Sequence, residues 1–118
     1  MDYDPNKPVY LQVVRDIQRK LITGKMPPGE KLPAVRETAV AYTINPNTAA
    51  RVYRELESSG LCFTRRGIGT FITEDHETIK RLRHELAVDS VETFLAEMKS
   101  MGFLPEETLR LLKERGVK

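Results

Sequence analysis

The stretch from Tyr42 to Leu56 constrains the fold of this 118-residue chain most, because it predicts a tight turn followed by a helix. Asn45 is a favourable N-cap, and Pro46 suits the first helical position because its φ is already helical. At about 100° per residue the apolar and polar side chains fall on opposite sides of this helix. The apolar side holds Ala49, Val52, Tyr53 and Leu56, and the polar side holds Asn47, Arg51 and Arg54, with Thr48 on a flank. Because such polar groups can bond base edges and phosphates, the stretch predicts a DNA-recognition helix.

Two further helices are expected before this one. From Val9 onward, apolar residues recur at helical spacing up to Gly24, which is a suitable stop. A Pro/Gly-rich connector follows, in which Lys31 and Leu32 can form a short strand, and a second helix is expected from about Pro33 to Tyr42. That helix turns Arg36 away from its apolar face. Two short helices joined by about three residues indicate a helix-turn-helix.

Residues 61–73 alternate apolar and polar side chains around a glycine-containing tip, which predicts a β-hairpin. Arg65 and Arg66 lie at the tip beside Gly67 and Gly69, so the hairpin has the character of a DNA-contacting wing. The glycines allow the backbone to approach a sugar-phosphate strand closely. Leu61, Phe63 and Phe71 are expected in the core, and Cys62 is expected to be a buried strand residue. Tyr10 and Tyr53 are likewise expected to be core residues rather than stacking platforms.

Composition changes after Thr73, so we expect a winged helix-turn-helix domain at residues 1–73 and a helical segment at residues 74–118. The fold class is mostly α (α+β). Two helices of this size cannot enclose a core alone, so they are expected to pack on the first part, on another copy, or on both. The expected homodimer contacts are Ile79, Leu82, Leu86, Val91, Phe94, Leu95, Leu109 and Leu112.

Charge and composition narrow the function classes. Residues 1–73 hold 11 Lys and Arg against seven Asp and Glu, whereas residues 74–118 hold eight against ten, so the first part is the better partner for a polyanion. With one cysteine there is no intrachain disulfide, and a cysteine-rich zinc site is excluded. The sequence has no membrane span, signal sequence or catalytic constellation, so a cytoplasmic protein without a cofactor is expected and an enzyme is the least expected class. His76 and His84 are expected to be surface residues rather than metal ligands.

Three motifs in order give this chain a resemblance to a known family. They are Pro27-Pro-Gly-Glu-Lys-Leu-Pro-Ala-Val-Arg-Glu37, Asn45-Pro-Asn-Thr48 and Thr64-Arg-Arg-Gly-Ile-Gly-Thr-Phe71. Together they resemble the winged helix-turn-helix of GntR-family bacterial repressors, and the short helical tail is similar to the YtrA-type branch. The resemblance implies a dimer on a two-fold-symmetric operator, with the third helix in the major groove and the wing near the minor groove. It implies DNA contacts at Arg36, Asn45, Asn47, Thr48, Arg66, Gly67 and Gly69, to which the pattern of helix and hairpin adds Arg51, Arg54 and Arg65.

The sequence departs from the family at three positions. Ala34 replaces the usual Ser, so the Ser-x-x-Glu capping box at the start of the second helix is expected to be absent. Thr43 replaces the usual turn Gly, so either Thr43 adopts a left-handed conformation or the turn differs. Ala50 stands where many members have Arg, so Arg51 either reaches the DNA backbone in its place or that contact is missing.

The leading hypothesis is therefore a dimeric repressor that binds double-stranded DNA, and the resemblance implies control of a nearby transporter operon. One alternative is a winged-helix adaptor that binds a protein partner and has no specific affinity for DNA. Another is a sensor that binds a small-molecule effector or a metal, for example in a pocket between two copies.

Overall fold

The computed structural model describes residues 1–117, which form two compact units. The first comprises Met1–Leu82 and the second begins at Arg83. The first unit extends beyond Thr73 because the long fourth helix begins within it. The division into functional domains at Thr73 stays a prediction.

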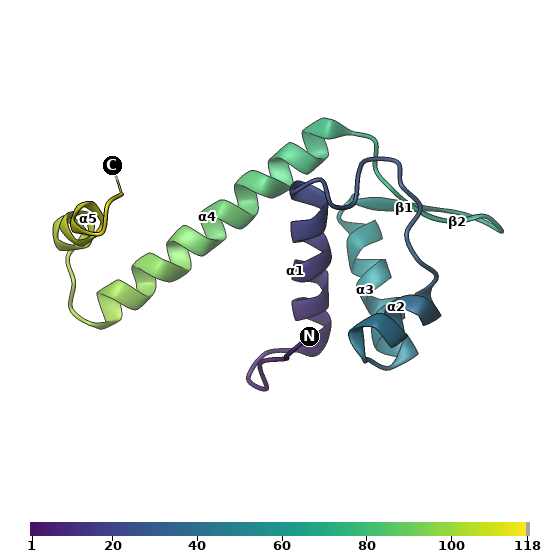
Figure 1. Ribbon diagram of the computed structural model, residues 1–118, viewed down its shortest axis with the longest axis horizontal. Coiled ribbons are helices and arrows are strands. Elements are labelled where there is room, and N and C mark those ends of the chain that lie inside the picture. Colours follow the sequence, from purple (N-terminus) through teal and green to yellow (C-terminus); the bar gives the residue numbers. More distant parts are fainter. Residues whose placement is uncertain (118) are drawn as a thin grey trace. The chain divides into compact units, whose positions relative to one another are not determined.

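Three helices and a hairpin build the first unit (Figure 1). Helix α1 spans Val9–Ile22, α2 spans Val35–Tyr42 and α3 spans Pro46–Ser58. Strands β1 (Cys62–Arg65) and β2 (Gly69–Ile72) then pair in antiparallel fashion. The expected winged helix-turn-helix is confirmed.

The core of this unit lies where α1, α2, α3 and the hairpin meet. Its largest fully buried side chains come from α1, α3 and the start and end of the hairpin: Val13, Ile17, Val52, Leu56, Leu61 and Ile72. Each such side chain contributes about 1.5–3 kcal/mol relative to exposure. The apolar face of α3 is fully used in this packing, so its polar face remains on the surface.

The hairpin corrects one expectation about the core. Register pairs Phe63 with Phe71, and their rings stack with centroids 5.8 Å apart. Phe63 is nevertheless 37% exposed and Phe71 is only half-buried, so the expected placement of both rings in the core was wrong. Side chains alternate between the two faces of the hairpin, and the paired residues Cys62 and Ile72 point inward and are buried. Leu61, next to Cys62, is also buried because it precedes β1 and takes no part in this alternation. Phe63 and Phe71 therefore lie on the outward side.

The connector before α2 runs beside the hairpin. Lys31 forms an isolated bridge with Phe71, and the N–H of Leu32 donates to the carbonyl of Thr70 at 2.8 Å. The expected short strand at Lys31–Leu32 is thus reduced to one bridge. The bridge and the Leu32–Thr70 hydrogen bond hold the connector against the hairpin, so the connector fixes the start of α2 relative to the wing.

Helix α4 (His76–Ser100) starts in the first unit and continues into the second, where Gly102 separates it from α5 (Pro105–Glu114). Leu82 is buried within one copy, whereas Ile79, Leu86 and Leu112 are half-buried. The remaining residues expected at a dimer contact are exposed: Val91, Phe94, Leu95 and Leu109. No helix in residues 1–117 is both long and apolar enough to cross a membrane.

Candidate nucleic-acid interface

The turn between α2 and α3 sets the direction of the recognition helix. Thr43 adopts the left-handed conformation with φ 55° and ψ 50°, the first of the two alternatives expected. It is the one non-glycine residue with positive φ in the described part of the chain. The N–H of Ile44 donates to the carbonyl of Ala39 at 2.9 Å, which closes α2 in a Schellman-like arrangement. The chain thus retains the turn at the expense of backbone strain in a β-branched residue.

The first turn of α3 is fixed by Asn45. Its side-chain Oδ1 accepts from the N–H of Asn47 at 2.7 Å, which confirms the expected N-cap. This bond occupies the oxygen and leaves the side-chain NH₂ of Asn45 available to donate. Asn45 and Asn47 are exposed and Thr48 is half-buried. The start of α3 therefore presents amide and hydroxyl groups, which suit hydrogen bonds to base edges.

Helix α2 begins with half of a capping box. Glu37 Oε1 accepts from the N–H of Ala34 at 3.1 Å, but the methyl group of Ala34 cannot accept a bond in return. Arg36 lies in this first turn with an exposed side chain. The first turn of α2 thus carries a cation beside the recognition helix.

The arginines predicted to contact DNA share one electrostatic property. Each is exposed, and none forms an ion pair with a carboxylate in residues 1–117. These arginines are Arg36, Arg51, Arg54, Arg65 and Arg66. Glu57, three residues after Arg54, does not neutralise it. Because the guanidinium groups are not already paired, they remain available for phosphate or base contacts.

Two of these arginines rest on aromatic rings. Arg51 Cζ lies 3.6 Å from the ring centroid of Tyr10, and Arg65 Cζ lies 5.6 Å from Phe63 and 5.8 Å from Phe71. Tyr53 is buried as expected, but Tyr10 is half-buried and serves as a stacking platform, so that expectation was wrong for Tyr10. Helical periodicity predicts which side chains of α1 face inward, but not which side chain at the edge of that face contacts another helix.

The wing glycines have different structural reasons. Gly67 has φ +77° and open space around its missing side chain, so the turn requires it and a ligand can approach closely. At Gly69, a Cβ would lie 2.5 Å from Lys31 Cε, so the lysine stem packs over this position. Lys31 is an exposed cation that sequence reasoning did not assign to the interface. The short strand expected at Lys31–Leu32 was the feature of the sequence that pointed to this segment.

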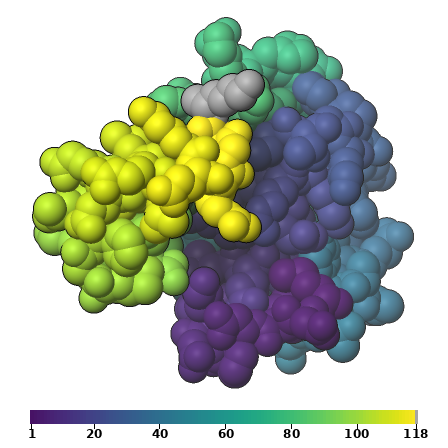
Figure 2. Space-filling view, turned by 60° about the vertical axis from the view of Figure 1, so that its left-hand side comes forward, coloured from purple at the N-terminus to yellow at the C-terminus, as the bar shows by residue number. Residues whose placement is uncertain are grey.

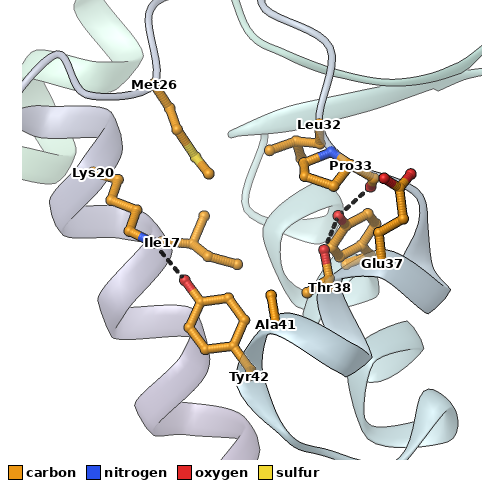
Figure 3. Close-up of a pocket in the computed structure, with 10 residues that line it drawn as sticks. Ile17, Lys20, Met26, Leu32, Pro33, Glu37, Thr38, Ala41 and Tyr42 are labelled. Atoms are coloured by element: carbon orange, nitrogen blue, oxygen red, sulfur yellow. Dashed lines mark hydrogen bonds between the residues drawn. The ribbon is translucent and has the colours of Figure 1, made fainter. Parts of the chain in front are cut away.

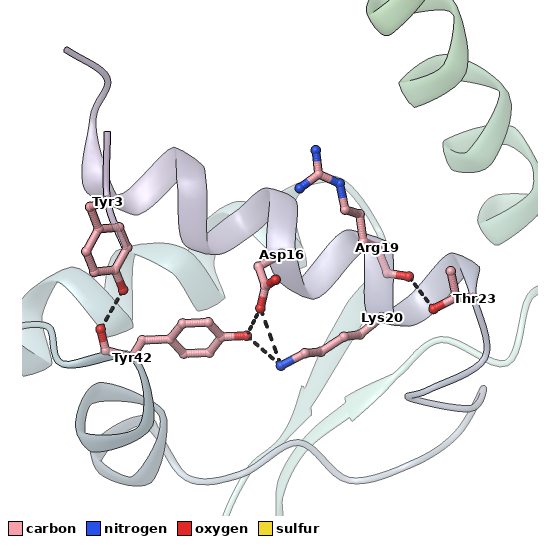
Figure 4. A network of polar contacts seen from close by, with 6 residues as sticks. All are labelled: Tyr3, Asp16, Arg19, Lys20, Thr23 and Tyr42. Atoms are coloured by element: carbon pink, nitrogen blue, oxygen red, sulfur yellow. Dashed lines mark hydrogen bonds and ion pairs between the residues drawn. The ribbon is translucent and has the colours of Figure 1, made fainter. Parts of the chain in front are cut away.

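A polar network ties α1 to the end of α2 (Figure 4). The Tyr42 hydroxyl donates to Asp16 Oδ2 at 2.6 Å and accepts from Lys20 Nζ at 3.0 Å. Lys20 also forms an ion pair with Asp16 at 3.3 Å. Tyr3, in the N-terminal arm, donates to the carbonyl of Tyr42. Figure 2 shows this arm (purple) beside the blue surface of the helix-turn-helix. The network therefore holds Tyr42, the residue before Thr43, by both its backbone carbonyl and its side-chain hydroxyl.

Burial and hydrogen bonding shift the pKa values of this network. Burial alone would raise the pKa of the Asp16 carboxyl, but the hydrogen bonds from Tyr42 and Lys20 outweigh it and lower the pKa. Burial, and then the hydrogen bond to Asp16, raise the pKa of Tyr42. Near neutral pH the network therefore contains an ionised Asp16 and a protonated Tyr42.

A second hydrogen-bonded residue joins α3 to the connector. The Tyr53 hydroxyl donates to the carbonyl of Pro33, so its bond to Thr38, at 2.6 Å, has the Thr38 hydroxyl as donor. Tyr53 thus links α2, α3 and the connector that runs beside the wing.

A pocket of about 310 Å³ lies beside this link (Figure 3). Its lining comes from α1, the connector, α2 and α3: Ile17, Lys20, Met26, Leu32, Pro33, Glu37, Thr38, Ala41, Tyr42 and Tyr53. Most of these side chains present carbon atoms, and Lys20 and Glu37 add charged groups. The pocket has the size and chemistry for a small, mainly apolar molecule.

His76 and His84 are exposed, and residues 1–117 contain no cluster of three or more metal-binding side chains.

The predicted site residues thus come from α2, α3 and the hairpin, which pack against one another in the first unit. Residues 9–72 match the family model described as bacterial regulatory proteins, gntR family. The chain is 41% identical over 111 residues to the HTH-type transcriptional regulator YhcF of Bacillus subtilis, covering 94% of this chain and 92% of that protein. It is also 41% identical over 78 residues to the HTH-type transcriptional repressor YtrA of Bacillus subtilis, covering 66% of this chain and 60% of that protein.

Solved structures show the same similarity. A GntR family transcriptional regulator from Listeria monocytogenes superposes with a TM-score of 0.86 at 37% identity, covering 95% of this chain and 98% of that one. The DNA-binding domain of AraR in complex with operator ORX1 superposes with a TM-score of 0.57 at 27% identity, covering 62% and 93%.

Proposed function

This chain belongs to the GntR family of bacterial regulatory proteins, and we propose that it is a dimeric repressor that binds a two-fold-symmetric operator. It is a transcriptional regulator with a winged helix-turn-helix DNA-binding domain. The proposal concerns the finer statements: the residues that contact DNA, the dimer, the repression and the regulated genes.

The observation that carries the proposal is the set of five exposed arginines on α2, α3 and the wing that lack carboxylate partners in residues 1–117. In a unit with seven acidic side chains up to Thr73, leaving all five unpaired favours an anionic partner. The similar AraR domain is described in complex with an operator, which supports DNA as that partner.

We assign separate roles to the three parts of the interface. Asn47 and Thr48, at the capped start of α3, contact base edges in the major groove, joined by the Asn45 side-chain NH₂. Arg36 contacts a base or a phosphate from the first turn of α2. Arg65 and Arg66 contact phosphates or the minor groove from the wing, where Gly67 lets the backbone approach. Arg54, Gly69 and Arg51 complete the proposed set.

One copy reaches only a few base pairs, so we propose a dimer that contacts two half-sites. Val91 and Leu95 lie four residues apart on α4, with Phe94 beside them, and all three are exposed in a single chain. Leu109, on α5, is 58% exposed. An apolar surface of this kind favours association with a second copy. Ile79, Leu86 and Leu112 stay in the proposed contact, whereas Leu82 is already covered within one chain.

By analogy with the repressor name of its relative YtrA, we propose repression as the sign of regulation. The target is an operon near the gene for this chain, with a transporter as the candidate product, and the site of action is the bacterial cytoplasm. Binding of selected random duplexes, followed by sequencing, tests DNA binding, operator symmetry and half-site spacing together. Enrichment of an inverted repeat supports the proposal, whereas no enrichment over unselected DNA contradicts it.

The adaptor alternative predicts no affinity above the non-specific level for any fragment of the chain's own promoter region, so the same titrations separate it from a repressor. A small effector is tested by thermal shift against metabolites, drugs and metals. Binding to the pocket beside α2 should raise the melting temperature. An Ala41→Leu variant, which narrows that pocket, should abolish the shift, and a shift that survives the substitution would place the ligand elsewhere.

A further inference from the structure

We propose that Tyr10 is a positioning residue for DNA binding: its ring seats the Arg51 guanidinium so that Arg51 contacts a phosphate of the duplex. The inference rests on the proposed function, because it assigns a role within the same interface. It adds a residue of α1 to an interface otherwise formed by α2, α3 and the wing.

The geometry indicates a stacked pair. Arg51 Cζ lies 3.6 Å from the Tyr10 ring centroid, whereas the other cation–ring distances in residues 1–117 lie between 5.2 and 5.8 Å. A separation of 3.6 Å is close to the van der Waals contact of two flat groups. Tyr10 lies in the first turn of α1 and Arg51 in the middle of α3, so the stack spans two helices that pack together.

The electrostatics favour an anion as the next partner of Arg51. An aromatic face attracts a guanidinium without cancelling its charge, whereas a carboxylate would compete directly with a phosphate. Arg51 has no carboxylate partner in residues 1–117 and its side chain is exposed. The N–H donors of a guanidinium lie in its plane, so stacking on one side leaves its edge available for bonds.

Pre-organisation gives the stack a function in binding. A free arginine samples many rotamers, and immobilising such a side chain on binding costs about 0.5–1.5 kcal/mol. Stacking on Tyr10 restricts those rotamers before DNA arrives. The stack also places the Arg51 guanidinium against α1, through the Tyr10 ring, rather than against another residue of α3. A contact with the backbone, which is independent of base sequence, is the expected result.

A double-mutant cycle on the full chain tests the inference. Affinities for a selected operator and for a random-sequence duplex are measured by fluorescence anisotropy at several salt concentrations. Arg51→Ala should weaken binding to both duplexes roughly tenfold and reduce the slope of log K against log salt by about one. Tyr10→Leu should weaken both about two- to fivefold, and Tyr10→Phe, which keeps a ring, should stay near wild type.

The decisive comparison is Tyr10→Leu in the Arg51→Ala background, where it should have no further effect. An equal loss in both backgrounds would overturn the positioning role, as would an Arg51→Ala variant with unchanged affinity and slope. Ring-current shifts of the Arg51 side-chain protons, lost in Tyr10→Leu, check the stack without DNA, and thermal unfolding checks that each variant folds.

The two duplexes keep this inference separate from the proposed function. If no operator is enriched but Arg51→Ala still lowers the salt slope on random duplex, specific regulation fails and the phosphate contact stands. If the operator binds specifically but the cycle shows no coupling, the proposed function stands and Tyr10 has no positioning role. A chain with no affinity for either duplex overturns both.

Discussion

The Tyr42 hydroxyl donates to Asp16 Oδ2 across 2.6 Å and joins the end of α2 to the middle of α1. Tyr42 is followed directly by Thr43, the left-handed residue of the turn into α3. The bond therefore bears on the placement of the recognition helix as well as on stability.

Replacing Tyr42 with Phe should reduce the free energy of unfolding by about 1 kcal/mol at pH 7, because the ring is kept and the bonds to Asp16 and Lys20 are lost. The folded-state pKa of Asp16 is lowered, so its stabilising contribution is complete above the unfolded value near 3.8 and is lost as pH falls through the folded value. Urea unfolding at pH 7 and pH 3 should show the difference between wild type and Tyr42→Phe narrowing in acid. A difference that is constant with pH would contradict the role of the ionised Asp16.

Replacing Thr43 with Gly should stabilise the protein by about 1 kcal/mol, because glycine adopts a left-handed conformation without the clash of a Cβ. Part of the gain is offset by the greater freedom of glycine in the unfolded chain. The melting temperature should rise by about 3–5 °C in calorimetry. Gly replacement at Val40, an exposed helical position on α2, serves as the control and should lower it.

Substitutions on the helices and on the wing of the proposed DNA interface should have different effects on operator affinity and on its salt dependence. Asn47→Ala or Arg36→Ala should weaken operator binding by about 1–3 kcal/mol if each makes a good base contact, and should affect random duplex less. Arg65→Ala should weaken binding to both and reduce the salt slope by about one. Anisotropy titrations give both quantities, with Lys25→Ala, an exposed cation of the connector, as the control. Wild-type operator affinity in Arg36→Ala would contradict the proposed docking.

The Cys62 thiol should be unreactive in the native protein. Burial, with a smaller effect of the Glu57 charge, raises its pKa from 9.0 to about 11. A thiol reagent at pH 8 should therefore react at a rate limited by unfolding, which urea should accelerate. The raised pKa favours the neutral thiol in the folded state, so this contribution to stability is present below pH 9 and is lost toward pH 11. Cys62→Ala should lack that alkaline loss.

A charge on the exposed apolar surface of α4, formed by Val91, Phe94 and Leu95, should disrupt the proposed dimer. Phe94→Glu places a carboxylate in a contact expected to be apolar, so analytical ultracentrifugation should show a shift toward monomer. Operator affinity should fall with it, because two half-sites would no longer be bound as one unit. Lys99→Glu, on an exposed part of the same helix, is the matched control. A Phe94→Glu chain that remains dimeric would move the interface elsewhere.

The local signals in the sequence were sufficient for the elements themselves. Asn45 and Pro46 predicted where α3 begins, and the apolar spacing of Ala49, Val52 and Leu56 predicted its buried side. These predictions hold because capping and helical periodicity involve residues within a few positions of one another. The hairpin followed from its glycines for the same reason.

Contacts between distant residues were decided by the tertiary structure. The sequence placed Phe63 and Tyr10 in the core by their apolar character, but pairing across the hairpin turned Phe63 outward, and packing of α1 against α3 placed Tyr10 beneath Arg51. Likewise, Thr43 left two conformations open until the closing bonds of α2 selected the left-handed one. By itself the sequence determined which segments form helices and strands and which of their faces are apolar, since short-range sterics and solvent exclusion act locally. Only the packed fold decided which cations stay unpaired and which rings support them, because those energies depend on neighbours that the chain brings together from far apart.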